Sequence, residues 1–157
     1  MMELLIVVVI LGVMVLIGPQ IFTQGTKFFI LGKTKLALQE EARASMYLMT
    51  REIRQAQSST IIIDQTAGQP YYSRIRFTKQ TNGVGTNVTI AQNGTNITLT
   101  EGNTVSTLTK NLTYLAFSFP ESDDMTILSV SMTLQEQIYG GAFKALHMAS
   151  EQVQVMD

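Results

Sequence analysis

Hydrophobic and polar positions divide the chain into three stretches with different periods. Residues 1–26 contain the uncharged run Leu4–Ile17, in which Gly12 is the only residue without an apolar side chain. Residues 27–58 repeat apolar or small residues at intervals of three, four or seven, the period of an amphipathic helix. Residues 59–157 alternate apolar and polar residues in short runs, as half-buried strands do. We therefore predict an apolar helix, an amphipathic helix and a β-rich globular domain.

The second stretch carries its apolar residues on one side of the predicted helix. Charged residues fall mostly on the other side, and Ser58-Ser59-Thr60 ends the helical pattern. We interpret the methionines of the stripe as core residues, because Met fills irregular gaps. The stripe consists of Leu31, Leu38, Ala42, Met46, Met49, Ile53 and Ala56.

Beyond Thr60 the pattern predicts short strands separated by turns. The turn signal Asn93-Gly94 lies between two of them, as expected for a hairpin. One long helix followed by several antiparallel strands predicts an α+β fold, in which the long N-terminal helix packs its stripe on an antiparallel β-sheet domain. The predicted strands are Thr60–Asp64, Tyr71–Thr78, Asn87–Gln92, Asn96–Glu101, Leu115–Phe119, Leu128–Leu134 and Ala145–Val155.

Three interpretations compete for the apolar run Leu4–Ile17. A cleaved signal peptide has a basic front and a small-residue cleavage site, whereas this run follows the acidic Glu3 and no Ala-x-Ala site follows it. A plain membrane anchor needs roughly 20 apolar residues, which the run reaches only with Ile21, Phe22 and the later residues 28–31. The third interpretation is a helix that lies first in a bilayer and later inside a protein bundle.

Two features modify this apolar helix. Glu3 at its start gains about 0.3–1 kcal/mol from the helix dipole when exposed. Burying Glu3 in a bundle is costly unless a cation pairs with it, and the N-terminal amine of a neighbouring copy is one such cation. The alternative is that Glu3 lies among lipid headgroups. Gly18-Pro19 is a break signal, so we expect the helix to kink or melt between Gly18 and Gly25.

Composition narrows the classes of function. The net charge of −1 argues against a general nucleic-acid-binding surface, which needs a basic excess. The chain has no cysteine and a single histidine, His147, so thiolate or clustered-histidine metal sites have no ligands. No nucleotide-binding loop or Gly-x-Ser-x-Gly elbow is present. We therefore expect neither an enzyme nor a cofactor, and we assign no catalytic residue.

The densest group of acids is Glu121-Ser122-Asp123-Asp124. Carboxylates of Glu121, Asp123 and Asp124 are of the type that binds calcium. One short loop supplies few oxygen ligands, however, so we expect a solvated turn and no metal.

Four asparagines fit the N-glycosylation acceptor pattern Asn-x-Ser/Thr. Asn and Thr are abundant in this part of the chain, so chance matches are expected, and Asn-Gly is also ordinary turn chemistry. The candidates for modification are Asn87, Asn93, Asn96 and Asn111.

The stretch from Glu3 to Gly12 resembles the N-terminal signature of type IV pilins and type II secretion pseudopilins. In that family a glutamate precedes an apolar helix, a glycine follows at the spacing of Gly12, and a proline lies near the position of Pro19. The run Met49–Ala56 also resembles the helix end of J-type minor pseudopilins and W-type minor pilins.

The resemblance implies a structural subunit of an extracellular pilus-like or pseudopilus filament. Its assembly residues would be Glu3, Gly12, Gly18 and Pro19, with Glu3 pairing to the N-terminal amine of a neighbouring subunit. The expected partners are further copies, other pilin-like subunits and an inner-membrane assembly platform. The expected location is the inner membrane before assembly, with N-terminal processing and methylation, and a filament afterwards. The alternatives are a minor tip or priming subunit and an anchored binding module that never polymerises.

Overall fold

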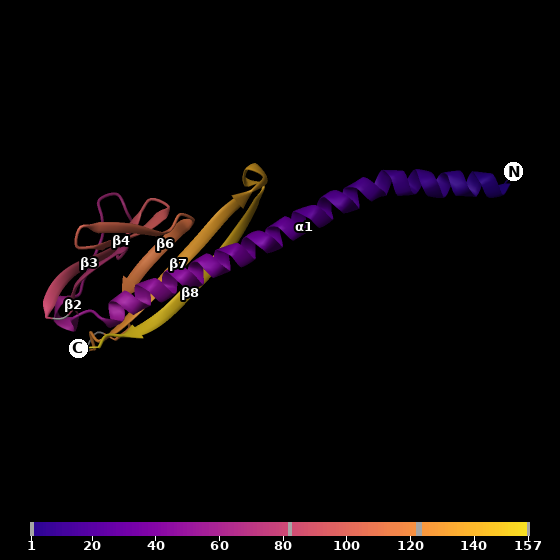
Figure 1. Cartoon of the computed structure of the whole chain (residues 1–157). Helices are drawn as coiled ribbons and strands as arrows, with labels where there is room; N and C mark the ends of the chain where they lie inside the picture. The colour runs from indigo at the N-terminus through magenta and orange to yellow at the C-terminus, as the bar shows by residue number, and fades with distance from the viewer. Residues whose placement is uncertain (1, 82, 122–123, 157) are drawn as a thin grey trace. The chain divides into compact units, whose positions relative to one another are not determined.

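The computed structural model describes residues 2–81, 83–121 and 124–156. One long helix, α1, precedes eight strands, and its residues up to Thr34 form a unit separate from the compact unit that begins at Lys35. This α+β arrangement confirms the predicted fold class. The elements are α1 (Met2–Arg54), η1 (Ser58–Thr60), β1 (Ile62–Asp64), β2 (Arg74–Thr81), β3 (Val84–Asn93), β4 (Asn96–Glu101), β5 (Thr104–Thr109), β6 (Leu112–Ser118), β7 (Ile127–Ile138), η2 (Tyr139–Gly141) and β8 (Phe143–Gln154) (Figure 1).

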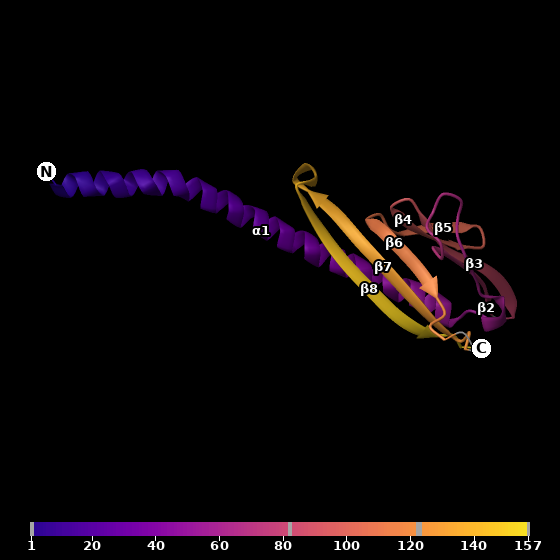
Figure 2. The ribbon, with the colours of Figure 1, turned by 180° about the vertical axis from the view of Figure 1, so that it is seen from behind.

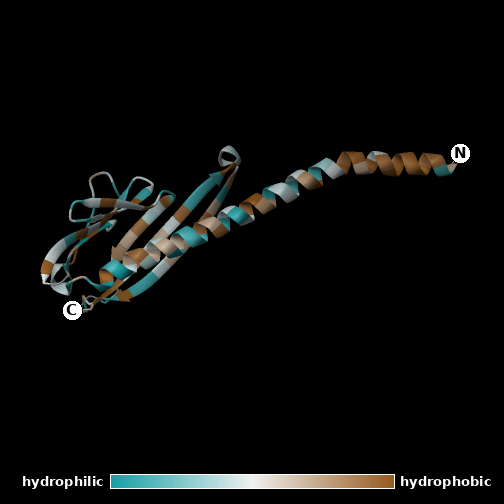
Figure 3. Ribbon diagram, viewed as in Figure 1, coloured by the Kyte–Doolittle hydropathy of each residue, from teal (hydrophilic) through white to brown (hydrophobic). Residues whose placement is uncertain are grey.

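The helix α1 is continuous through Gly18 and Pro19, so it does not melt there in this structure. Its axis changes direction where the apolar segment ends (Figures 1 and 2). Proline removes one helix hydrogen bond but has a backbone φ compatible with a helix, and the flanking apolar residues maintain the helical conformation on both sides. The brown segment in Figure 3 is the apolar run predicted from the sequence.

The helix ends at Arg54, earlier than the predicted residue 58. Its last turn tightens through i→i−3 bonds, since the amides of Gln55 and Ala56 donate to Glu52 and Ile53. The chain then turns away because the Gln57 amide donates to the Thr78 carbonyl of β2 at 3.0 Å. The three residues predicted to stop the helix, Ser58–Thr60, form η1.

The strands form two antiparallel sheets. The first contains β1 to β5 in sequence order, and its β3–β4 hairpin turns at Gly94, where φ is +61° as the Asn-Gly signal predicts. The second contains β6, β7 and β8, and β7 and β8 pair over twelve residues without a register shift. The sequence did not predict β5, because most of its side chains are exposed and show no alternation.

The core of the second unit lies between α1 and the two sheets. The stripe residues from Leu38 to Ala56 are buried as predicted, whereas Leu31 is only partly buried. Figures 1 and 2 show α1 crossing one face of β7 and β8. The sheets supply Ile75, Ile90, Leu115, Phe117, Leu128, Val130 and Leu134, which are completely buried.

Candidate functional site

The candidate assembly site lies in the first unit, on α1. Glu3 occupies the first turn of the helix and is exposed to solvent. Every apolar side chain from Leu4 to Ile17 is also exposed, with 49–74% of its surface accessible. The most apolar stretch of 18 residues contains no buried residue, and α1 is long and apolar enough to cross a membrane. This part of the chain therefore requires an apolar environment outside the monomer.

The other predicted assembly residues lie along the same helix. No heavy atom of another part of the chain lies within 4 Å of a Cβ built on Gly12 or Gly18, so neither glycine is required by packing inside the monomer. Pro19 lies inside the helix, about 24 Å from Glu3 at 1.5 Å per residue. The structure thus places Glu3 and Pro19 at opposite ends of one apolar rod, and they do not form a local cluster.

Two threonines follow Pro19 in the region predicted to be weak. The Thr23 hydroxyl donates to the Gln20 carbonyl, and the Thr26 hydroxyl donates to the Phe22 carbonyl, both at 2.9 Å. Hydroxyl groups bonded to the preceding turn require no water, so both are compatible with an apolar environment. The polar residues after Pro19 therefore leave the helix intact.

The second unit contains a buried charge cluster that joins α1 to the first sheet. Lys79 Nζ lies 2.7 Å from Glu52 Oε2 and 2.6 Å from Glu101 Oε1, and Arg51 Nη2 lies 2.7 Å from Glu52 Oε1. Glu52 is 3% exposed and Lys79 is 8% exposed. Burial opposes ionisation of Glu52, but hydrogen bonds from Lys79 and Arg51 outweigh it and lower the pKa of Glu52.

The Lys79 ammonium shows the reciprocal effect. Burial alone would lower the pKa of Lys79, but the Glu101 and Glu52 carboxylates raise it above its usual value. Both groups are therefore charged at neutral pH. The cluster has a structural role in fixing the end of α1 to β2, and its carboxylates are already occupied by cations.

A second polar contact fixes the β5–β6 connection to α1. Glu41 accepts hydrogen bonds from the Thr109 hydroxyl, from the Lys110 amide at 3.2 Å and from Asn111 Nδ2 at 3.0 Å. One turn later on α1, the Ser45 hydroxyl donates to the Leu108 carbonyl at 3.2 Å. Burial opposes ionisation of Glu41, yet these donors lower its pKa.

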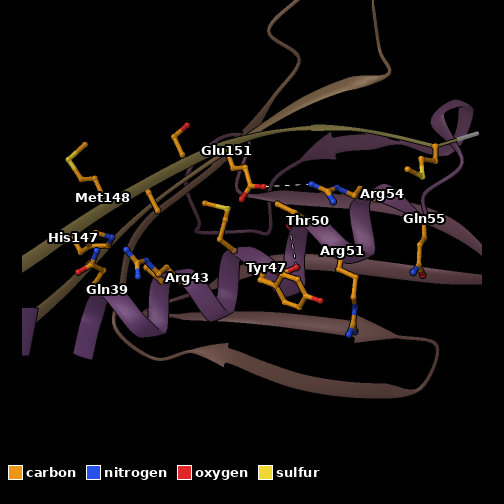
Figure 4. Close-up of a pocket in the computed structure, with 15 residues that line it drawn as sticks. Gln39, Arg43, Tyr47, Thr50, Arg51, Arg54, Gln55, His147, Met148 and Glu151 are labelled. Atoms are coloured by element: carbon orange, nitrogen blue, oxygen red, sulfur yellow. Dashed lines mark hydrogen bonds and ion pairs between the residues drawn. The ribbon is translucent and has the colours of Figure 1, made fainter. Parts of the chain in front are cut away.

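A groove of about 720 Å³ lies in the second unit between α1 and β8, one of the two edge strands of the three-stranded sheet. Its helix wall presents Arg43, Arg51 and Arg54, and its strand wall presents His147 and Glu151 (Figure 4). Arg54 Nη2 lies 3.9 Å from Glu151 Oε1, which is beyond hydrogen-bond distance. Three arginines therefore line the groove against one half-exposed carboxylate, and the Arg51 guanidinium is already bound to Glu52.

The predicted acidic group lies in the β6–β7 connection. Asp124 accepts hydrogen bonds from the Thr126 amide at 2.8 Å and from the Thr126 hydroxyl at 2.5 Å, an arrangement typical of a turn. Glu121 is exposed, and Asp123 lies outside the described residues. Within residues 2–81, 83–121 and 124–156, no group of three His, Cys, Asp or Glu side chains is placed to hold a metal.

The four glycosylation candidates have different environments. Asn87 and Asn93 are exposed, and Asn96 is partly exposed at the start of β4. Asn111 donates its side-chain nitrogen to Glu41. Because the glycan would be attached to that same nitrogen, the folded structure disfavours modification of Asn111 and leaves the other three candidates open.

Sequence reasoning missed the roles of Glu41 and Lys79. Glu41 lies at the edge of the predicted helix stripe, one residue before Ala42, and Lys79 directly follows the predicted strand Tyr71–Thr78. Glu41 binds Thr109, which lies 68 residues away along the chain, and Lys79 binds Glu52, which lies 27 residues away. A single sequence carries no local signal for pairs so distant.

Comparison of the chain with protein-family models, with curated proteins and with solved structures gave no match.

Proposed function

We propose that the chain is a structural subunit of a filament of the type IV pilus or pseudopilus kind. The apolar segment holds the subunit in the inner membrane before assembly and becomes part of the filament core afterwards. The proposal assigns the chain no chemistry on a small molecule. The observation that carries it is an exposed, uninterrupted apolar helix with a carboxylate in its first turn, continuous with the core helix of an α+β unit.

The exposed apolar surface supports both locations. Leu4–Ile17 contains fourteen residues, and all except Gly12 have apolar side chains. Burying the remaining exposed surface of one such side chain gains roughly 1–2 kcal/mol, so the segment as a whole gains on the order of 15 kcal/mol. This equals or exceeds the total stability of a typical domain. Transfer from lipid to a bundle of similar helices costs little, because both environments are apolar.

Glu3 supports the assembled state. A carboxylate at the start of an apolar helix is tolerated at a headgroup surface, but inside a bundle it requires a cation. The N-terminal amine of an adjacent subunit is such a cation, and pairing would set the axial register of the two helices. Removing the partner of a buried charge costs about 3–5 kcal/mol, so registers that leave Glu3 without an amine would be disfavoured by about that amount.

Two alternatives have specific support. The helix end Met49–Ala56 resembles that of minor subunits, which favours a position at the tip or in priming. The open groove between α1 and β8 favours an anchored binding module that never polymerises. The filament proposal gives Glu3 a partner, whereas the binding module leaves it at the membrane surface.

Shear release from producing cells, followed by electron microscopy and mass spectrometry, tests the proposal. Filaments composed mainly of this chain, and lost in a Glu3→Ala strain, support a main subunit. Filaments with only traces of the chain indicate the minor subunit. Glu40→Ala, which removes an exposed carboxylate from the second unit, is the matched control and should leave filaments intact. Absence of filaments, with the wild-type chain retained in membranes, contradicts the proposal.

A further inference from the structure

The groove between α1 and β8 combines a row of polar side chains with three methionines. Gln39, Arg43, Tyr47 and Arg51 line it at intervals of four residues, which places them along one row of α1, and Gln55 follows directly after the helix ends. The sulfur-containing side chains of Met46, Met148 and Met156 also line the groove. Such a surface fits a partner that is acidic and carries at least one exposed apolar side chain.

The guanidinium groups of the groove differ in how they are paired. Arg51 is bound to Glu52, and Arg54 has only the long contact with Glu151. Arg43 has no ion pair within residues 2–81, 83–121 and 124–156. Arg43 and Arg54 therefore remain available to a carboxylate of another molecule.

The chain itself carries a surface of this chemistry. No lysine or arginine occurs between Lys110 and Lys144, although Glu121, Asp123, Asp124 and Glu136 fall in that interval. Among the described residues of the β6–β7 connection, Glu121 is exposed and Met125 is 61% exposed. A carboxylate and a methionine four residues apart match the guanidinium groups and methionines of the groove.

The position of the connection sets the arrangement of two copies. The Val155 amide donates to Thr126, and the Met156 amide donates to Arg54, so Thr126, at the end of the connection, lies near the Arg54 end of its own groove. Arg43 is eleven residues earlier on α1, or about 16 Å along the helix axis. A parallel copy shifted by that distance would bring its connection beside Arg43 of its neighbour.

We propose that the groove between α1 and β8 binds the acidic β6–β7 connection of a second, parallel copy, with Glu121 of one copy facing Arg43 of the other. This inference rests on the proposed function, because it defines a contact between neighbouring subunits. The two surfaces are different, so the contact is head-to-tail. It leaves a free connection on the copy whose groove is filled and a free groove on the other copy. Contacts of this kind propagate into helical filaments.

Disulfide cross-linking of the full chain tests the contact, because the protein has no cysteine. One tagged copy carries Gln39→Cys in the groove, and a differently tagged copy carries Met125→Cys. The two copies are produced together, and membrane and sheared fractions are oxidised. We expect a cross-linked dimer of the two copies. The matched control pairs Gln39→Cys with Val105→Cys, an equally exposed position on β5, and should give at most about a tenth of that yield.

Charge reversal gives the second measurement. Arg43→Glu should lower the cross-link about tenfold, because it places two carboxylates together. Glu121→Lys in the partner copy should then restore the yield to within about threefold. Lys144→Glu changes the net charge equally but lies on the exposed face of β8, so it should have no effect. Neither Arg43 nor Glu121 has an ion pair in the described structure, so reversal should not unfold the chain.

The results separate this inference from the proposed function. A cross-link no stronger than the Val105 control, or reversal of Arg43 without effect or without rescue, overturns the groove contact. Normal filaments without the cross-link overturn the groove contact alone. If no filaments form, the proposed function fails, and the cross-link in the membrane fraction still decides whether copies meet at the groove.

Discussion

Replacing Lys79 by methionine should destabilise the second unit by about 3 kcal/mol. The change removes the ammonium from 2.7 Å of Glu52 and 2.6 Å of Glu101. Breaking a buried ion pair costs about 3–5 kcal/mol. The remaining Arg51 contact to Glu52 places the cost near the lower limit, and the loss at the half-exposed Glu101 adds at most about 1 kcal/mol.

Urea denaturation of the full chain in detergent micelles measures this change. Circular dichroism of the sheets follows unfolding, and ΔG is taken from the midpoint and slope. The double variant Lys79→Met/Glu52→Met removes both charges, so it should recover most of the loss and lie within about 1.5 kcal/mol of the wild type. A Lys79→Met loss below about 0.5 kcal/mol, or a double variant as unstable as the sum of its singles, would refute the reasoning.

Three further predictions concern the second unit. Acid unfolding should begin as the pH falls below about 4.5. The pKa values of Glu41 and Glu52 are lowered in the folded chain, so both carboxylates stabilise the fold fully above that pH and lose this effect when they are protonated. Circular dichroism against pH checks this, and a flat profile to about pH 3 would contradict it. Ile53→Ala should cost about 2–5 kcal/mol in urea denaturation, because the side chain is fully buried; a loss under 1 kcal/mol would show that the α1 contact is dispensable. In a host that attaches N-glycans, peptide mass spectrometry should find Asn93 modified and Asn111 unmodified, and a glycan on Asn111 would mean that modification precedes the contact with Glu41.

The sequence predicted those elements whose apolar residues have a regular period. The α1 stripe from Leu38 to Ala56 and the alternation of Leu128–Leu134 in β7 were both confirmed, because burial of one face leaves a periodic signal. The exposed strand β5 leaves none. The helix continues through Pro19 because the φ of proline is compatible with a helix and only one backbone hydrogen bond is lost.

The candidate site was predictable only in part. Glu3 and the apolar run are adjacent in sequence, so their relation is visible without a structure. The groove arises from α1 and β8, whose residues Gln39 and His147 are separated by more than a hundred positions. The row from Gln39 to Arg51 is visible as a four-residue spacing, but its accessibility depends on where the last strand lies.

The bond between the Met156 amide and Arg54 has a consequence for synthesis of the chain. These residues are 102 positions apart, so α1 leaves the ribosome long before β8, which lies against α1 together with β7 (Figures 1 and 2). During that interval the apolar stripe of α1 is uncovered, and pairing across such a separation is slow. A nascent chain that stops before residue 143 would present this stripe permanently to chaperones and proteases. Completion of the last strand therefore ends the period in which the stripe is uncovered.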